Sequence, residues 1–444
     1  MVTRKTPPAG RTTIQRPLGG TEKIYWLLDK LYCLNFAAYV ELEGKLDPDD
    51  LQAALSEVQG ATPLLRSRIV VENNKPSFAP VDPEKYPLQL EILALRGWRR
   101  KLEQQLDTAF PTGTAPLARF LWFRGKAAKS VVAIVFHHPI ADGRSGVHIL
   151  LETLRRAAGT APPPAQCPAR PSVQELDHIR QKHPVASKLK EIRFWLAKGR
   201  ELLSMASQLP GYDMNASGQR QTASIELAIS KSRSKSLLSA CRAHETSVHG
   251  AIGAAQVMAL NDEFRTRKAR VMALNSLADL RGVIDGDLSE KDLGLYVSTL
   301  TTLHSLDANP DFWRLATEVR DNLQRIITSG DADLIHSFYP GSALFTPDVS
   351  GAQKVQKIVA LAPPSSMLTN IGRIDEVDLG QGLAVRETGF LLSPPAQCPI
   401  CVTASSYRGG MLLNLLYDRG KINQTQAKRI AGNLLRHLEE AAQV

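Results

Sequence analysis

The sequence of 444 residues contains few cysteines and no long apolar run. No stretch approaches the roughly 18 consecutive apolar residues of a transmembrane helix, so we predict no membrane span. Residues 1–16 are basic and lack the apolar core of a secretory signal, which indicates a loose basic tail. These absences favour a cytoplasmic protein.

Cysteine chemistry is poorly supported by the sequence. The five cysteines are an odd and sparse set, which gives no disulfide framework. Only Cys398 and Cys401 have the spacing of a metal or redox motif, but a zinc site would need a second pair, and none exists. A thioredoxin-like motif would stand at the start of a helix, whereas the residues after Cys401 have the pattern of a strand. We therefore expect structural cysteines and no metal site.

The basic residues are scattered along the chain. Lysine and arginine number 54 against 44 acidic residues, and no basic run is interleaved with aromatic residues. This pattern argues against nucleic acid as a partner. The net charge of +10 still favours an anionic partner through long-range attraction. A phosphorylated cofactor and an acidic protein fit this charge equally well.

The first part of the chain alternates strands and helices. Residues 35–44 have the pattern of a strand, and 46–60 repeat apolar residues at helical spacing. Residues 117–123 and 130–136 are apolar runs that predict two paired strands, and a helix follows over 145–159. Such alternation predicts a mixed sheet covered by helices.

The second part of the chain repeats this alternation of strands and helices after a segment that is not expected to pack. Residues 159–172 are rich in proline and alanine and cannot form a packed element, so they are the best linker candidate. Beyond them we expect further strands, one of them over 356–362, and helices. We therefore divide the chain into the basic tail, an N-terminal lobe over 17–175 and a C-terminal lobe over 176–444. Two such lobes suggest an enzyme with its site between them.

One short segment, FHHPIADGRSG at 136–146, contains most of the titratable chemistry. An apolar strand leads into His137 and His138, and because neighbouring strand residues alternate between faces, the two rings should point to opposite sides. Asp142 follows, and Gly143 allows the positive φ of a tight turn before the next helix. A strand-turn-helix junction of this kind can hold an imidazole rigidly, as a general base requires.

The segment from His137 to Gly143 resembles the HHxxxDG signature of the chloramphenicol acetyltransferase-like acyltransferase superfamily. That superfamily includes nonribosomal peptide condensation domains and polyketide-associated acyltransferases. Residues 17–29, 42–69 and 366–374 are also similar to segments of these families, so the resemblance covers most of the chain. It implies two chloramphenicol acetyltransferase-like α/β lobes, each a mixed sheet with helices, arranged in a V around a central tunnel.

The resemblance also implies roles for individual residues. His138 would remove the proton from an acceptor hydroxyl or amine, which then attacks a thioester carbonyl. Asp142 would pair with an arginine of the second lobe and hold the geometry, and Arg281 stands at the matching position. His137 would pack or hydrogen-bond. The oxyanion needs hydrogen-bond donors, for which the candidates are Ser366, Thr369 and Asn370, although these residues could equally be a polar strand end between the lobes.

The implied substrates are an acyl thioester and a small acceptor. No bound cofactor is expected, because the acyl group arrives on the phosphopantetheine of an acyl or peptidyl carrier protein or of coenzyme A. The product would be an ester or an amide, in polyketide, nonribosomal peptide or lipid secondary metabolism. The diffuse positive charge favours a carrier protein as the donor. We expect a monomer without a fused adenylation or carrier segment.

The sequence departs from some branches of this superfamily and disfavours several other kinds of site. Arg144 stands where peptide condensation domains usually carry a tryptophan, and the DFGWG segment of the plant branch is absent. A metal site is disfavoured because adjacent histidines of a strand converge poorly on one ion. The residues around Ser145 lack the G-x-S-x-G spacing of a serine hydrolase, and residues 380–385 match no phosphate-binding loop. The remaining alternative is a non-catalytic condensation-like module that recruits partners, against which the intact His138, Asp142 and Gly143 argue.

Overall fold

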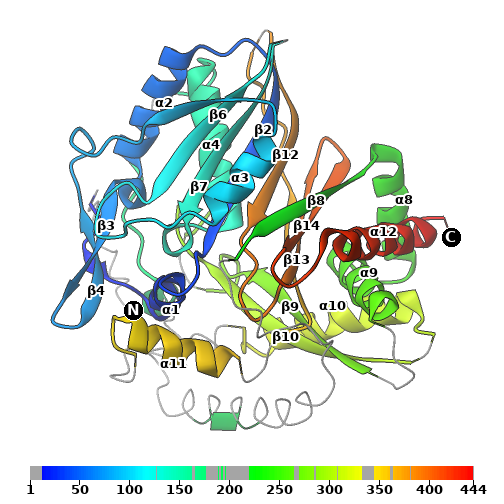
Figure 1. Cartoon of the computed structure of the whole chain (residues 1–444). Coiled ribbons are helices and arrows are strands. Elements are labelled where there is room, and N and C mark those ends of the chain that lie inside the picture. Colours follow the sequence, from blue (N-terminus) through cyan, green and yellow to red (C-terminus); the bar gives the residue numbers. More distant parts are fainter. Residues whose placement is uncertain are drawn as a thin grey trace, which may run out of the picture.

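The chain folds into two α/β lobes that lie side by side (Figure 1). The computed structural model describes residues 13–126, 128–162, 166–176, 220–264, 270–284, 287–307, 309–332, 345–360, 364–380 and 382–443, together with Leu189, Ile192, Arg193 and Leu196. Two separate apolar cores, one per lobe, account for most buried side chains. The predicted pair of mixed α/β lobes is confirmed.

The first lobe is built on a five-stranded sheet. Its strands are, in spatial order, β12 (Leu383–Leu392), β2 (Asn35–Gly44), β7 (Lys129–His137), β6 (Ala118–Arg124) and β5 (Leu90–Ala94). The sheet is mixed, because β5 runs parallel to β6 while the other neighbours are antiparallel. The central strands β2 and β7 are buried along most of their length, which explains their nearly continuous apolar sequences. The sheet is completed by β12, which comes from the late part of the chain.

Helices and a small sheet surround this core. The helices are α1 (Gly20–Asp29), α2 (Pro48–Ala61), α3 (Trp98–Leu106) and α4 (Gly143–Ala157), with a 3₁₀ turn η1 (Pro63–Arg66). Helix α4 packs on β2 and against α2. A three-stranded sheet contains β1 (Arg16–Pro17), β4 (Lys75–Pro80) and β3 (Ser67–Glu72). Residues 1–12 of the predicted basic tail lie outside the described residues, and its last residue, Arg16, belongs to β1 and forms two hydrogen bonds of 2.7 Å with the Glu22 carboxylate.

The second lobe is built on a six-stranded sheet. Its strands are, in spatial order, β10 (Val297–Leu306), β9 (Arg270–Asp279), β11 (Ser366–Arg373), β13 (Ile400–Tyr407), β14 (Gly410–Asp418) and β8 (Thr222–Ile229). Four helices lie together beside this sheet, on the right in Figure 1: α8 (Lys231–Ala243), α9 (Val248–Glu263), α10 (Phe312–Thr328) and α12 (Gln424–Ala441). A short helix, α5 (Val173–Leu176), precedes this lobe in the chain. The lobe boundary at 175/176 stays a prediction, since β12 lies in the second half of the sequence but in the first sheet.

The strand predicted over 356–362 is wrong. Residues Val349–Val359 form helix α11, which packs against α1 (Figure 1), and residues 361–363 lie outside the described part of the chain. Two signals favour the helix. The Asp348 carboxylate accepts the Gly351 backbone N–H at 2.9 Å, which caps the first turn, and Ala352 and Val355 are buried at helical spacing. The β-branched pair Ile358–Val359 suggested a strand, but local propensity is weaker than this capping and packing.

The two lobes are joined along one seam by helix α3 and strand β8. Strand β8 is an edge strand, and two of its backbone N–H groups donate to carboxylates of the α3 segment. Thr222 N–H donates to Asp107 at 2.7 Å, and Ser224 N–H donates to Glu103 at 2.8 Å. Carboxylates four residues apart on a helix match strand residues two apart, because both spacings are about 6 Å. The first lobe thus satisfies an edge that would otherwise be open to pairing.

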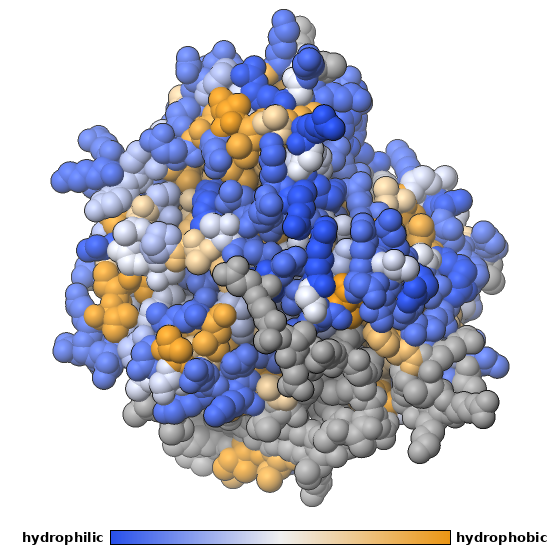
Figure 2. All heavy atoms as spheres, in the orientation of Figure 1, coloured by the Kyte–Doolittle hydropathy of each residue, from blue (hydrophilic) through white to orange (hydrophobic). Residues whose placement is uncertain are grey.

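The face of the molecule in Figure 2 and the five cysteines can be described briefly by their polarity and pairing. Figure 2 shows a mainly hydrophilic face on which apolar residues form small separate patches. All five cysteines are free, and burial raises the pKa of the Cys401 thiol well above its ordinary value. Among the described residues, no helix is long and apolar enough to cross a membrane.

Candidate active site

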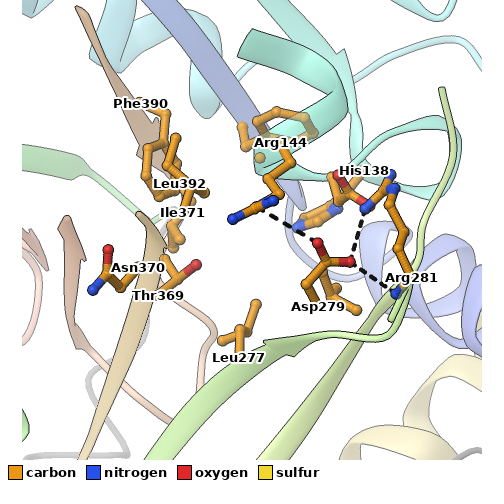
Figure 3. A pocket seen from close by; sticks show the side chains of 14 residues that line it. His138, Arg144, Leu277, Asp279, Arg281, Thr369, Asn370, Ile371, Phe390 and Leu392 are labelled. Atoms are coloured by element: carbon orange, nitrogen blue, oxygen red, sulfur yellow. Dashed lines mark hydrogen bonds and ion pairs between the residues drawn. The ribbon is translucent and has the colours of Figure 1, made fainter. Parts of the chain in front are cut away.

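A pocket lies between the two lobes and collects residues from both sheets (Figure 3). It contains about 510 Å³ of space, part of it open to solvent. Its lining comes from β2, the HHPIADG segment and β12 on one side and from β9, β10 and β11 on the other. The lining residues are Phe36, His138, Asp142, Gly143, Arg144, Leu277, Asp279, Arg281, Val297, Thr369, Asn370, Ile371, Phe390 and Leu392.

His138 presents one ring nitrogen to this pocket. Strand β7 ends at His137, and His138 begins a short 3₁₀ turn, η2 (His138–Ile140). Its Nδ1 lies 3.0 Å from the Ala141 carbonyl oxygen. A carbonyl can only accept, so Nδ1 carries a proton and, in the neutral ring, Nε2 is left as the acceptor. Burial lowers the pKa of His138 below its ordinary value of 6.5, although the bond to Ala141 opposes this shift.

Aromatic rings fix the plane of the His138 imidazole. The Tyr25 ring meets it edge-on, with centroids 4.7 Å apart, and the Phe36 ring lies 5.0 Å away on a tilted plane. The His138 backbone N–H donates to the Leu34 carbonyl at 3.2 Å. The side chain and the backbone are therefore both held, as the sequence predicted for this junction.

His137 points away from the pocket. Its side chain is fully buried, and Nε2 lies 3.4 Å from the Asp29 carboxylate without a well-formed hydrogen bond. The Phe110 ring lies 5.9 Å away. This environment agrees with the expected packing role, although His138 lies in a 3₁₀ turn rather than in the strand that ends at His137.

Asp142 and Arg281 form a buried ion pair across the lobe interface. Arg281 Nη2 lies 2.9 Å from Asp142 Oδ2, and their side chains are 6% and 1% exposed. Asp142 also caps helix α4, accepting the Ser145 backbone N–H at 3.0 Å, and accepts the Tyr296 backbone N–H at 3.0 Å. Its carboxylate is thus fully occupied and is not hydrogen-bonded to His138. The structure brings together the two residues that the sequence analysis paired.

Arg281 is held by more than Asp142. Nη1 donates to Asp279 at 3.1 Å, and Nε donates to the Ser289 carbonyl at 3.0 Å. Nη2 also donates to the Asp292 carbonyl at 3.3 Å. Burial alone would lower the pKa of Arg281, but the two facing carboxylates raise it above the ordinary value. The guanidinium is therefore a fixed, charged anchor for Asp142.

Gly143 is required for a reason other than the one predicted from the sequence. It is the first residue of helix α4 and does not adopt a positive φ. A Cβ at this position would lie 3.1 Å from Ile371 Cγ2 and 3.5 Å from the Phe390 ring. The glycine thus allows β11 and β12 to approach the helix start. Gly146, which the sequence analysis missed, does the same against Phe36, where a Cβ would lie at 2.7 Å.

Of the three oxyanion candidates, two reach the pocket. Thr369 and Asn370 line it, and the Asn370 side-chain oxygen accepts the Gly372 backbone N–H at 2.8 Å. Ser366 lies elsewhere: its hydroxyl contacts the Gln256 side chain of α9 and lies 3.3 Å from the Ile400 carbonyl. Ser366 and Thr369 are an odd number of residues apart on β11, so alternation places these two side chains on opposite faces of the strand. Ser366 is therefore not in a position to contact a ligand here.

Two charged pocket residues and its apolar wall received no role from the sequence. Arg144 and Asp279 flank motifs that were recognised, the first following Gly143 directly and the second lying two residues before Arg281. In the sequence, only their position next to those motifs could have indicated that Arg144 and Asp279 line the pocket. The wall comes from four separate strands, and period-two alternation alone does not say which face borders a pocket; its residues are Leu277, Val297, Ile371, Phe390 and Leu392.

Comparisons with known proteins place the chain in a family. A family model described as the condensation domain matches residues 25–336, which is more than half of the chain. Isonitrile lipopeptide synthase from Mycobacterium tuberculosis is 27% identical over 167 residues, covering 35% of this chain and 7% of that protein. The matched part is thus a small fraction of that relative's length.

Solved structures share the fold over nearly the whole chain. The first condensation domain of the calcium-dependent antibiotic synthetase, in complex with a substrate analogue, matches with a TM-score of 0.73 and 16% identity over 97% of each chain. Polyketide synthase associated protein 5 from Mycobacterium tuberculosis matches with a TM-score of 0.67 and 15% identity, over 96% of this chain and 97% of the other. At these identities the likeness is one of fold.

Proposed function

The chain belongs to the condensation-domain family, and on that premise we propose that it transfers an acyl group from a phosphopantetheine thioester to a hydroxyl or amine. The observation that carries this proposal is the fixed imidazole of His138. Its Nδ1 is committed to the Ala141 carbonyl at 3.0 Å, which leaves Nε2 as the basic atom in the pocket. The family and the lipopeptide synthase relative support a role in secondary metabolism.

His138 acts as the general base in the proposed reaction. Nε2 takes the proton of the acceptor hydroxyl or amine while the acceptor oxygen or nitrogen attacks the thioester carbonyl carbon. The tetrahedral intermediate then collapses, the carbon–sulfur bond breaks, and the thiolate leaves with the proton that His138 had taken. No acyl-enzyme forms. Base catalysis of this kind typically contributes about 10²- to 10⁴-fold.

The other site residues hold the segment that contains His138 or donate hydrogen bonds to the reacting group. Asp142 does not contact His138, so it holds the loop and the lobe interface rather than relaying charge. The oxyanion of the tetrahedral intermediate needs a donor in the pocket. We assign this role to the Thr369 hydroxyl or the Asn370 amide, because both side chains line the pocket and Ser366 does not.

The acyl donor is proposed to be a carrier protein. Coenzyme A would need a compact group of cations at one mouth for its phosphates, whereas an acidic carrier helix needs a broad basic surface. The 54 basic residues are spread over the chain rather than gathered in one cluster, which favours the carrier. The acceptor is a small molecule with a hydroxyl or an amine.

The function is tested by offering one acyl group on three donors. The acyl group is attached to a candidate carrier protein, to pantetheine and to coenzyme A, and the released thiol is measured with and without a panel of hydroxyl and amine acceptors. We expect thiol release only when an acceptor is present, faster from the carrier than from coenzyme A, and slower at high salt because docking is electrostatic. Thiol release that needs no acceptor would contradict acyl transfer. Faster turnover of coenzyme A would overturn only the carrier preference.

The pH dependence of the reaction follows from the pKa of His138. The base must be neutral, and burial lowers its pKa below the ordinary 6.5. The protonated fraction therefore reaches one half only at a pH below 6.5, and kcat/KM should fall along an acid limb whose midpoint lies below 6.5. A pH profile of kcat/KM between about pH 4.5 and 8, with circular dichroism at each pH to exclude unfolding, measures this limb. An acid limb centred above 6.5 would refute the assignment of the limb to His138.

A further inference from the structure

Arg144 is the second residue of helix α4, and its side chain extends into the pocket. Figure 3 shows its guanidinium between the β11–β12 wall, represented by Ile371 and Leu392, and Asp279. The side chain is 43% exposed, and its one charged contact among the described residues joins Nε to Asp279 Oδ2 at 3.5 Å. The terminal Nη1 and Nη2 groups have no acceptor within the described part of the chain. A charged, planar donor group thus faces the same space as His138.

The second guanidinium of the pocket belongs to Arg281 and, unlike that of Arg144, has all its nitrogens hydrogen-bonded within the protein. Every nitrogen of the Arg281 guanidinium donates to an acceptor, and the group is 6% exposed. Its single positive charge faces two carboxylates, Asp142 at 2.9 Å and Asp279 at 3.1 Å. Asp279 is 30% exposed and accepts from Arg281 on one oxygen, so its longer contact with Arg144, through Nε at 3.5 Å, leaves the Nη1 and Nη2 donors of Arg144 unused by any described residue. Among the described residues, the two terminal nitrogens of Arg144 are therefore available to a ligand.

The long contact with Asp279 does not by itself account for the position of Arg144. Exposed pairs contribute little, and a separation of 3.5 Å is longer than a charge-assisted hydrogen bond between nitrogen and oxygen. Here the guanidinium stands beside the buried apolar residues Phe390 and Leu392, where a bound ligand would displace water and strengthen an ionic contact. Guanidinium groups bind carboxylates with two parallel hydrogen bonds, and Nη1 and Nη2 offer that geometry while Nε remains toward Asp279.

We propose that Arg144 binds a carboxylate carried by one of the two reactants, close to the carbon that reacts. This inference rests on the proposed acyl transfer and adds the substrate class. The anion is not the phosphate of the phosphopantetheine arm, because the full length of that arm separates the phosphate from the thioester, whereas Arg144 shares a pocket with His138. The carboxylate belongs either to the acyl group, as in a dicarboxylic half-thioester, or to the acceptor, as in a hydroxy or amino acid.

Two binding experiments separate these sources. In the donor arm, succinyl-pantetheine is compared with its methyl ester, without any acceptor. In the acceptor arm, a hydroxy acid is compared with its methyl ester, without any donor. Equilibrium binding by calorimetry is measured for the wild type, Arg144→Gln and Arg144→Lys. The matched control is Arg155→Gln, because Arg155 lies on the same helix, is 42% exposed and makes a similar long contact of 3.7 Å with Glu152, but does not line the pocket.

The expected result is a carboxylate preference in one arm, and that arm identifies the source. The wild type should bind the carboxylate at least about tenfold more tightly than the ester, as a hydrogen-bonded charge pair provides. Arg144→Gln should abolish the preference without changing ester affinity, Arg144→Lys should keep part of it, and Arg155→Gln should keep all of it. A preference that survives in Arg144→Gln, or no preference in either arm, overturns the inference. Because no turnover is involved, neither result depends on the acyl-transfer assay.

Discussion

We expect His138→Ala to lower kcat/KM by about 10²- to 10⁴-fold, the range that loss of a general base typically costs. The substitution removes Nε2, the basic atom of the pocket, and leaves the backbone bond from the His138 N–H to the Leu34 carbonyl in place. The His138 side chain is half-buried beside the pocket, so its loss should have a modest effect on folding. The measurement is thiol release from a pantetheine thioester at saturating acceptor, with circular dichroism to confirm that the variant is folded.

The neighbouring histidine supplies the control. His137→Ala removes an imidazole of the same kind that is fully buried on the other side of the strand end, 3.4 Å from the Asp29 carboxylate. We expect it to act through stability, lowering the melting temperature while the folded fraction keeps most of its activity. Turnover by His138→Ala within a few-fold of the wild type would remove the general base from the proposal. Absence of acceptor-dependent thiol release by the wild type itself would instead favour a non-catalytic module that recruits partners.

Much of the local structure could be predicted from the sequence, because local signals agree with the tertiary structure. The strand predicted over 35–44 has the same limits as β2, and the apolar run before His137 is the buried strand β7. The turn between β3 and β4 contains Asn73 and Asn74, both in left-handed conformations that asparagine tolerates. Such elements depend on residues near in sequence.

The parts that were missed depend on distant contacts. Strand β12 was not predicted, and its place is set by pairing with β2, a strand more than 300 residues earlier in the chain. The face that Ser366 presents depends on the register of β11 against its neighbours, in which a shift occurs between Asn370 and Gly372. The role of Gly143 depends on Ile371 and Phe390, which reach it from the late strands β11 and β12. No periodicity within one segment contains this information.

In the candidate site, too, residues close together in the sequence could be predicted, whereas contacts between distant segments could not. The candidate base could be located from the strand, the motif and the following helix, all within a few residues. Arg281 could be paired with Asp142 only through the family resemblance, since the two residues come from different lobes. Arg144 lay next to the motif, but its exposure to the pocket depends on β9, β11 and β12, which contribute other lining residues. The ion pair accordingly joins the HHPIADG segment of the first lobe to the second lobe.

Asp142 and Arg281 should behave as one unit in stability. Removing one partner of a buried ion pair leaves the other charge without compensation and costs about 3–5 kcal/mol. Asp142→Ala also removes the cap of α4, worth about 1 kcal/mol. The variant Asp142→Asn separates these effects, because asparagine keeps the cap and the shape while removing the charge. We expect both Asp142 variants to lower the midpoint of urea unfolding and the activity, the alanine more than the asparagine.

A double-mutant cycle decides whether Arg281 is the true partner. Asp142→Ala, Arg281→Ala and the double variant are compared by urea unfolding, and we expect the double variant to be more stable than the sum of the single effects predicts, since no charge is then left buried. Asp279→Ala serves as the control, because Asp279 also contacts Arg281 but is 30% exposed, so its loss should couple weakly. Additive effects for Asp142 and Arg281 would mean that the Ser145 and Tyr296 N–H groups, rather than the guanidinium, hold this carboxylate in place.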